Sequence, residues 1–269
     1  MPGDRDIPLS IDVGTPNAAR MYDYYLGGDN NFPADREAAE KVLRAAPWLR
    51  ATALENRAFL ARAVGYLAGE AGAGQFVDIG TGLPTRGNVH QVAQRAAPDA
   101  RIAYVDNDPV VLGHSRALLA RTPGTATIRA DLRDPDAIIS HPSLTALIDW
   151  AQPVAVLLVA VLHFIPSADD PAGIVARFRA AMAPGSHIVI THLHHPAGDD
   201  SLHRVLSIYR QASAPLLART SEQIESLFTG FDLVEPGLVP LQQWRPATEP
   251  DPGQEIWGLG GAGRIGQSR

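Results

Sequence analysis

Residues 75–85 read QFVDIGTGLPT, and this stretch is the strongest indication of the fold. Its apolar first half predicts a buried strand, which runs directly into Gly80 and Gly82. Glycines at such positions let the backbone turn tightly and approach a ligand closely, and a helix that follows presents free backbone N–H groups. A G-x-G turn alone is weak evidence for a ligand. The stretch therefore predicts the first strand of a Rossmann-like unit, whose function depends on the neighbouring strand ends.

The chain downstream of this turn alternates between short apolar runs and helical stretches. Such alternation predicts a parallel sheet with right-handed crossovers and helices on both faces. The run of residues 154–161 is continuously apolar, as expected of a central strand buried on both faces. Two further strands are expected near the end of the chain. The sequence therefore predicts an α/β fold with a mostly parallel, seven-stranded sheet. The candidate strands are residues 75–80, 101–106, 125–131, 154–165, 186–193, 231–235 and 254–261, and the candidate helices between them are 86–97, 109–121, 135–150 and 172–183.

Two helices are expected before this core. Residues 34–46 have helical composition and end at Pro47, because proline lacks the amide donor that a continuing helix needs. Residues 51–70 carry an apolar stripe at helical spacing. We therefore expect an N-terminal helical extension or lid in residues 1–74 and a Rossmann-like core in residues 75–269.

The composition disfavours several classes of protein. A net charge of −6 gives no attraction for a phosphate backbone, so we expect no nucleic-acid partner. The absence of cysteine excludes disulfides, thiolate nucleophiles and Cys-ligated zinc. No apolar run approaches the roughly 18 residues of a membrane span, and the first residues lack a signal-peptide pattern. We expect a cytoplasmic protein that acts on a small molecule; the oligomeric state stays open.

Three aspartates each close a predicted strand: Asp78, Asp106 and Asp131. The carboxyl ends of parallel strands meet at one edge of a sheet, where open α/β folds bind ligands. Asp106 could accept two charge-assisted hydrogen bonds from a ribose diol. Asp131 could take an adenine amine, and the Leu132 amide could reach a ring nitrogen. One aspartate could simply cap a helix, as Asp108 suits, but three together favour a shared adenosine-bearing ligand.

The turn favours S-adenosyl-L-methionine over a nicotinamide dinucleotide. The dinucleotide fingerprint G-x-G-x-x-G requires glycine at position 85, where this chain has Thr85 after Pro84. A diphosphate also needs close approach to a helix N-terminus, whereas S-adenosylmethionine needs room for a methionine tail beside Asp78 and Gly80. A nicotinamide-dependent oxidoreductase is therefore the less favoured alternative.

Several stretches of the chain resemble an actinobacterial family of S-adenosylmethionine-dependent methyltransferases, long catalogued as a domain of unknown function. The resemblance covers almost the whole chain, and QFVDIGTGLPT and YVDNDP are its most specific parts. It implies a class I methyltransferase sheet with an N-terminal helical extension, and it implies no substrate. The other matching stretches are TPNAARMYDYYLGGDNNFPADREAAEK, ENRAFLARAV, VAVLHFIP and GFDLVEPGLVPLQQWRP.

The resemblance also implies which residues hold the cofactor. Pro84 stands near the position where methyltransferases often have a third glycine, so the turn departs from the commonest pattern there. The implied residues are Asp78, Gly80, Thr81 and Gly82 at the methionine end, Asp106 and Asn107 at the ribose, and Asp131 and Leu132 at the adenine. We also expect Ala160, in the apolar run of residues 154–161, among the cofactor-binding residues.

Residues 17–31, NAARMYDYYLGGDNN, are dense in aromatic side chains, Asn and Gly, as a functional lid can be. In one interpretation Arg20 and Arg57 hold the methionine carboxylate, and Tyr22, Tyr24 or Tyr25 walls the methyl-transfer chamber. In the other, the tyrosines pack the helical layer on the sheet while the arginines pair with acidic neighbours, Asp23 or Asp35. Both interpretations stay open.

His163 follows the central strand and could act as a general base if its pKa lies near neutrality; alternatively it is a satisfied residue of the crevice wall. The other nearby histidines, at 187, 192, 194 and 195, lack a recognisable ligand spacing, so we expect no metal. Because no acid–base pair is obvious, a regulatory protein that binds the cofactor without transferring its methyl group is a further alternative.

Overall fold

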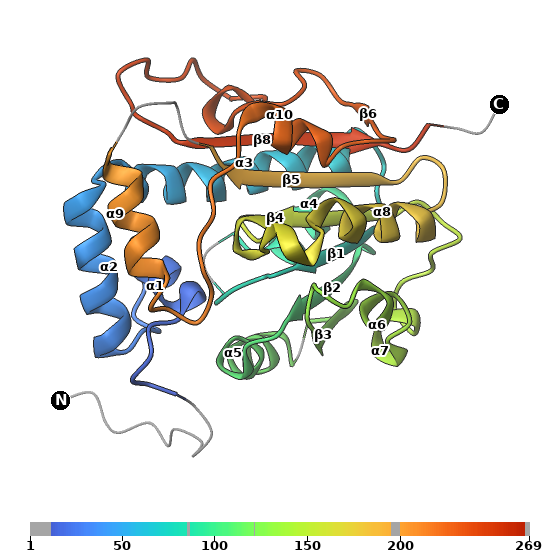
Figure 1. The fold of residues 1–269 in the computed structure, drawn as a ribbon. Coiled ribbons are helices and arrows are strands. Elements are labelled where there is room, and N and C mark those ends of the chain that lie inside the picture. The colour runs from blue at the N-terminus through green and yellow to red at the C-terminus, as the bar shows by residue number, and fades with distance from the viewer. Residues whose placement is uncertain (1–11, 85–86, 121, 195–199, 267–269) are drawn as a thin grey trace.

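The computed structural model describes residues 12–84, 87–120, 122–194 and 200–266. Its centre is a single sheet with strand order β3-β2-β1-β4-β5-β8-β6, with β7 pairing with β8 outside this path (Figure 1). Strands β1 to β5 are parallel, and β8 is antiparallel to β5. The mostly parallel α/β sheet is thus confirmed. The strands are β1 (Gln75–Ile79), β2 (Arg101–Asp106), β3 (Thr125–Arg129), β4 (Ala155–Val159), β5 (His187–Leu193), β6 (Asp232–Leu233), β7 (Val239–Pro240) and β8 (Gly258–Arg264).

Helices cover both faces of the sheet, as the alternation predicted. Side chains alternate across a strand, so Val77 packs into one apolar cluster and Phe76 into the cluster on the opposite face. Leu157 and Leu158 of β4 divide in the same way, and all of β4 is buried, which confirms the predicted central strand. The helices beside the strands are α3 (Trp48–Gly69), α4 (Val89–Ala96) and α5 (Pro109–Leu119) on one side, and α6 (Pro135–Ile139), α7 (Pro142–Thr145) and α8 (Pro171–Ala181) on the other.

Two expectations about element boundaries need correction. The helix expected over residues 135–150 is two short helices, because Pro142 has no N–H to continue α6 and instead begins α7. Among the described residues the sheet has eight strands, where seven were expected. The additional strand, β7, is a two-residue pair with a proline, too short to show any periodicity in the sequence.

Strand β8 begins later than the apolar run that predicted it and consists largely of glycine. A Cβ atom on Gly260 would lie 2.7 Å from Cε2 of Phe59, so the bare backbone is what lets α3 pack this closely against the strand. The position of β8 therefore depends on close packing of its glycines against α3. Hydrophobic periodicity in the sequence cannot detect such packing.

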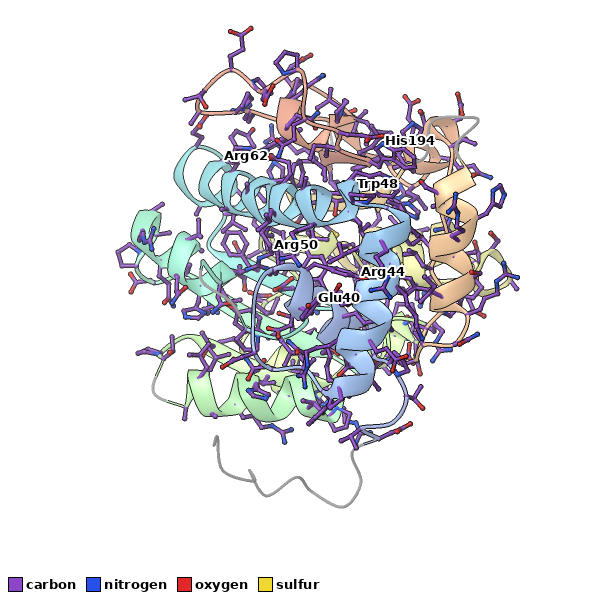
Figure 2. The ribbon with its side chains drawn as sticks, turned by 90° about the vertical axis from the view of Figure 1, so that its left-hand side faces the viewer. Glu40, Arg44, Trp48, Arg50, Arg62 and His194 are labelled. Atoms are coloured by element: carbon purple, nitrogen blue, oxygen red, sulfur yellow. The ribbon has the colours of Figure 1, made fainter. Side chains whose placement is uncertain are left out.

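A third apolar cluster lies beyond the carboxyl ends of the parallel strands, where Figure 1 shows α1, α2 and α9 gathered together. Figure 2 shows Glu40 and Arg44 along α2, and Trp48 at the start of α3. Although α3 precedes the expected boundary at residue 74, it packs on the sheet itself through Phe59. No helix in the described ranges is long and apolar enough to cross a membrane. The remaining helices are α1 (Ala18–Tyr25), α2 (Pro33–Ala45), α9 (Asp200–Tyr209) and α10 (Ser221–Ser226).

Candidate functional site

A cavity of about 550 Å³, called the larger cavity below, lies over the carboxyl ends of β1 to β4. This volume is within the range of small-molecule sites. Asp78, Asp106 and Asp131 all line it, so the three strand ends do meet in one crevice. The strand ends bring with them Gly80, Thr81, Gly82, Asn107, Leu132 and Ala160, which also line the larger cavity.

The two glycines in the turn after β1 have different roles. Gly80 and Gly82 have φ angles of +69° and +65°, a left-handed conformation that glycine adopts without strain. A Cβ on Gly80 would lie 2.4 Å from Cγ2 of Val161, so this glycine permits close packing. A Cβ on Gly82 would meet no atom within 4 Å, because Gly82 borders the open cavity. Gly82 thus leaves space that a ligand can fill.

Asp78 and Arg57 form the charged part of the larger cavity at the end of β1. The Asp78 carboxylate accepts a hydrogen bond of 2.9 Å from the Thr81 hydroxyl. Burial raises the pKa of Asp78 to about 6, against the opposing effects of the Thr81 hydrogen bond and the Arg57 charge. Arg57 reaches the cavity from α3 and makes a long hydrogen bond, 3.4 Å, to the Gly87 carbonyl. Within the described ranges this is the one hydrogen bond that its guanidinium makes, so most of its donors are open to a ligand.

Asp106 is held by backbone N–H groups on both sides. One carboxylate oxygen accepts from Gly82 N at 2.9 Å, and the other accepts from Asp108 N at 2.9 Å. Its burial raises its pKa, and these backbone hydrogen bonds oppose that effect. Each oxygen still has a second lone pair for a ligand hydroxyl. The exposed Asn107 lies beside it in the cavity wall.

Asp131 is paired with Arg133. The two side chains form a fork, with distances of 2.6 Å from Nη2 to Oδ2 and 3.0 Å from Nε to Oδ1. This hydrogen-bonded guanidinium lowers the pKa of Asp131. Leu132 is buried beside the pair and contributes apolar wall.

Arg20 does not reach the larger cavity, which corrects one interpretation of the N-terminal segment. Its Nε lies 2.7 Å from Oδ2 of Asp35, and its Nη2 donates to the carbonyls of Asp12 and Thr15. Both partners of the ion pair are buried, with side chains 4% and 0% exposed. Arg20 therefore fixes the N-terminal segment in place. This agrees with the alternative interpretation, in which Arg20 pairs with Asp35. Of the two arginines, only Arg57 lines the cavity.

The N-terminal segment nevertheless forms the wall opposite the strand ends. Asn17, Ala18, Ala19 and Tyr22 line the larger cavity together with residues 213–215. The side-chain amide of Asn17 donates to Asp108 at 2.7 Å, which ties the start of α1 to the end of β2. Asn17 was not among the predicted site residues, and the sequence offered no signal for it beyond its place at the start of residues 17–31.

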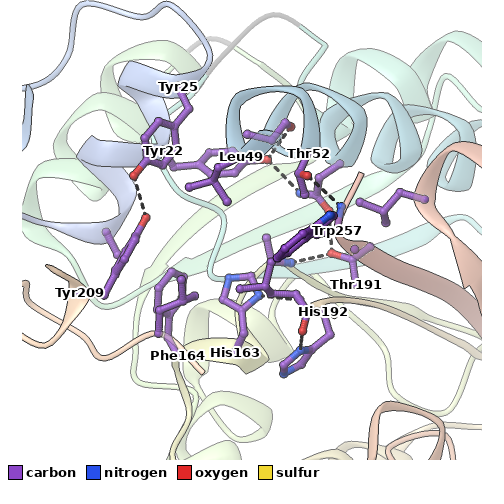
Figure 3. Close-up of a pocket in the computed structure, with 18 residues that line it drawn as sticks. Tyr22, Tyr25, Leu49, Thr52, His163, Phe164, Thr191, His192, Tyr209 and Trp257 are labelled. Carbon is purple, nitrogen blue, oxygen red and sulfur yellow. Dashed lines mark hydrogen bonds between the residues drawn. The ribbon is translucent and has the colours of Figure 1, made fainter. Parts of the chain in front are cut away.

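A smaller chamber of about 60 Å³ adjoins the larger cavity, because Ala18, Tyr22, Asn56, Ala160 and Phe164 line both. It lies between α1, α3, β5 and the start of β8 (Figure 3). The main side chains of the smaller chamber are Tyr22, Tyr25, Leu49, Thr52, His163, Phe164, Thr191, His192, Tyr209 and Trp257. Tyr22 and Tyr25 thus wall a chamber next to the larger cavity, whereas the Tyr24 hydroxyl bonds to Glu40 on α2.

A hydrogen-bonded chain organises the boundary between the two spaces. The Asn56 amide oxygen accepts from the Thr191 hydroxyl at 2.7 Å, and the amide nitrogen donates to the Tyr22 hydroxyl at 2.9 Å. The Thr191 hydroxyl accepts from the backbone N–H of Ala160 at 2.8 Å. Ala160 needs this support, because its φ of 56° is unfavourable for a residue with a Cβ. Asn56 and Thr191 were missed in the sequence, where nothing links residues so far apart.

His163 lines the smaller chamber but does not meet the condition set for a general base. Burial, together with the nearby His192 and Arg219, lowers its pKa well below the usual value. The ring is therefore neutral near pH 7 and a weak base. No group of three or more His, Cys, Asp or Glu side chains suited to a metal occurs within the described ranges.

The parallel sheet with its antiparallel β8, the helices on both faces and the acidic crevice over β1 to β3 define a class I, Rossmann-like methyltransferase. A family described as S-adenosyl methyltransferase matches residues 4–267, and the chain belongs to that family. Its cofactor is S-adenosyl-L-methionine. The family resemblance seen in the sequence is thereby confirmed, and the nicotinamide alternative is disfavoured.

Two solved structures are similar over nearly the whole chain. A candidate methyltransferase of Thermobifida fusca YX shares 43% identity with a TM-score of 0.92, covering 98% of this chain and 100% of its own. A DUF574 family protein of Streptomyces avermitilis MA-4680 shares 39% identity with a TM-score of 0.91, covering 94% and 99%. Human N-acetylserotonin methyltransferase in complex with SAM, at 15% identity and a TM-score of 0.51, covering 94% of this chain and 63% of its own, shares the fold. No protein among the curated sequences matches.

Proposed function

We propose that this chain transfers the methyl group of S-adenosyl-L-methionine to a small-molecule acceptor bound in the smaller chamber. The observation that carries the proposal is the common wall, because Tyr22, Asn56 and Ala160 line both spaces. A cofactor in one space and an acceptor in the other would lie side by side. The bound cofactor supplies an electrophilic methyl group, so the task left to the chain is to orient the two molecules and exclude water.

The residues of the larger cavity fit this cofactor, and their proposed roles follow from their places in it. The Asp106 carboxylate, fixed by two backbone N–H groups, accepts the ribose hydroxyls, with Asn107 beside it. Asp131 and Leu132 border the adenine. Arg57 is the cation available for the methionine carboxylate, and Asp78 lies nearby for its ammonium group. The space beside Gly82, which a side chain would fill, belongs to the ligand.

Calorimetry with S-adenosylhomocysteine tests the cofactor site. We expect Asp106→Asn to weaken binding by about 2 kcal/mol, since an amide offers the ribose one acceptor oxygen and no charge. Asp99→Asn is the matched control, because Asp99 is an exposed aspartate remote from the larger cavity. Equal affinities for wild type and Asp106→Asn, with unchanged melting temperatures, would remove Asp106 from the site.

Turnover separates the enzyme from a protein that only binds the cofactor. Incubation with S-adenosylmethionine and pooled small metabolites should release S-adenosylhomocysteine in proportion to enzyme concentration. Tight cofactor binding without release under any mixture would favour a regulatory protein instead. Enhancement of NADH fluorescence at micromolar concentration would instead support the oxidoreductase alternative.

A further inference from the structure

The smaller chamber offers a ligand almost no hydrogen-bond acceptors. Its lining, which lies wholly in the described part of the chain, contains no Asp, Glu, Lys or Arg. The Tyr22 hydroxyl is satisfied, since it donates to the Ala53 carbonyl at 3.0 Å and accepts from Asn56. The Thr191 hydroxyl is satisfied in the same way by Asn56 and by the Ala160 N–H. These polar atoms hold the wall together and are not left for a substrate.

The polar groups that remain can each act as donors. The hydroxyls of Tyr25 and Tyr209 lie 3.1 Å apart, so one proton joins the pair and the other proton stays available. Burial raises the pKa of both tyrosines, which keeps both hydroxyls protonated at neutral pH. Figure 3 shows this pair at one side of the smaller chamber, with Phe164 and His163 beside it.

His163 is also a donor in this arrangement. Its Nδ1 accepts the backbone N–H of Leu193 at 3.3 Å, so the neutral ring carries its proton on Nε2. No hydrogen-bond partner for Nε2 occurs among the described residues, and part of the His163 surface is open in the chamber wall. His163 can thus donate to a ligand oxygen, while acting as a base would require it to give up the Leu193 hydrogen bond.

The guanidinium of Arg219 is a buried positive charge near these donors. Arg219 is 8% exposed, and its guanidinium donates to the carbonyls of Leu162 and Ile165 and to Nε2 of His192. All three partners are uncharged, and no carboxylate pairs with Arg219 in the described ranges. The His192 ring lies 5.5 Å from that of His163. The charge of Arg219 also helps to lower the pKa of His163, so its positive field extends to the chamber wall, which favours an anion there.

We propose that the smaller chamber binds a small carboxylic acid with an apolar body, as its carboxylate, and that the chain converts this acid to its methyl ester. The inference rests on the proposed methyltransferase function. A carboxylate oxygen takes the methyl group, the carbon–sulfur bond breaks with its electron pair remaining on sulfur, and a neutral ester and a neutral thioether result. No proton is transferred, so the chamber needs donors and no general base, which is what it contains.

Binding of matched acids and amides tests the inference. The protein, saturated with S-adenosylhomocysteine, is titrated by calorimetry with acetate and propionate and with acetamide and propionamide, which have the same shapes without the charge and are small enough for a chamber of about 60 Å³. We expect at least one acid to bind tenfold or more tighter than its amide and to yield a labelled, extractable ester from methyl-labelled cofactor. If neither acid is preferred over its amide, or if phenol binds and is methylated in preference to both acids, the inference is overturned.

Two variants of His163 add a test of the donor role. His163→Leu should lose about tenfold in carboxylate affinity, whereas His163→Gln, which keeps an N–H donor, should stay within threefold of wild type; the amide affinities should not change. His203→Leu, on the exposed side of α9, is the control. Equal carboxylate affinity in His163→Leu and wild type would contradict the donor role. Failure to bind S-adenosylhomocysteine at all would instead refute the proposed function, so the two failures are distinguishable.

Discussion

The carboxylate of Asp106 accepts a hydrogen bond from the backbone N–H of Gly82 at 2.9 Å, and this bond joins the ends of β1 and β2. The same carboxylate accepts from Asp108 N, so its orientation is fixed before any ligand arrives. The glycine turn and the acidic residue therefore form one unit. A substitution at either residue should therefore change the affinity for a ligand that contacts the other.

Substitution of Gly82 separates backbone strain from loss of ligand space. Gly82→Ala and Gly72→Ala both place a Cβ on a residue with positive φ, +65° and +71°, in open surroundings. Each should cost about 1 kcal/mol of stability by urea unfolding. Because only Gly82 borders the larger cavity, only Gly82→Ala should also lose affinity for S-adenosylhomocysteine, by about tenfold or ~1.4 kcal/mol. Equal affinity losses in the two variants would contradict the assignment of this space to the ligand.

Asp78 should make the stability of the ligand-free protein fall between about pH 4 and pH 6. Its pKa rises from 3.8 in the unfolded chain to about 6 in the folded protein, mainly through burial. Between these two pKa values the folded state binds a proton that the unfolded chain has released. The free energy of unfolding is therefore greatest below this pH range and decreases as pH rises, by up to about 3 kcal/mol.

The variant Asp78→Asn tests this linkage by urea unfolding at pH 4.5, 5.5 and 7. Asparagine keeps an acceptor for the Thr81 hydroxyl and does not titrate. Relative to wild type, Asp78→Asn should gain stability steadily from pH 4.5 to pH 7. A difference that does not change with pH would show that Asp78 does not titrate in this range.

The Arg20–Asp35 ion pair should matter for folding and not for cofactor binding. Arg20→Met leaves the buried Asp35 carboxylate without its cation, which should cost about 3 kcal/mol. Lys41→Met is the control, since the Lys41–Glu37 pair is exposed and should contribute less than about 1 kcal/mol. The folded fraction of Arg20→Met should bind S-adenosylhomocysteine within twofold of wild type. A much larger loss of affinity would return Arg20 to the cofactor site.

Gly260 should be intolerant of a methyl group because of Phe59. A Cβ there would lie 2.7 Å from Cε2 of the Phe59 ring, and relieving this overlap should cost about 2 kcal/mol in Gly260→Ala. Phe59→Leu shortens the offending side chain, so the double variant should be less destabilised than the sum of the single variants. Strict additivity in urea unfolding would show that the ring and the strand do not compete for the same space.

The sheet and the acidic crevice could be predicted from the amino-acid sequence. Strand, glycine turn and helix follow one another within residues 75–96, and their chemistry is local: apolar runs form strands, and glycines allow the turn. Once the strands are parallel, Asp78, Asp106 and Asp131 must arrive at the same edge. This arrangement of the three aspartates does not depend on how the remaining segments pack.

The packing of distant segments selects the side chains that complete the site. Arg20 and Arg57 were equivalent candidates in the sequence, and the buried Asp35 claims one of them while α3 delivers the other to the cavity. The smaller chamber, the proton position on His163 and the burial of Arg219 among uncharged partners depend on contacts between segments distant in the chain. Such contacts leave no periodic or spacing signal, because they arise only when the packed elements bring their side chains together.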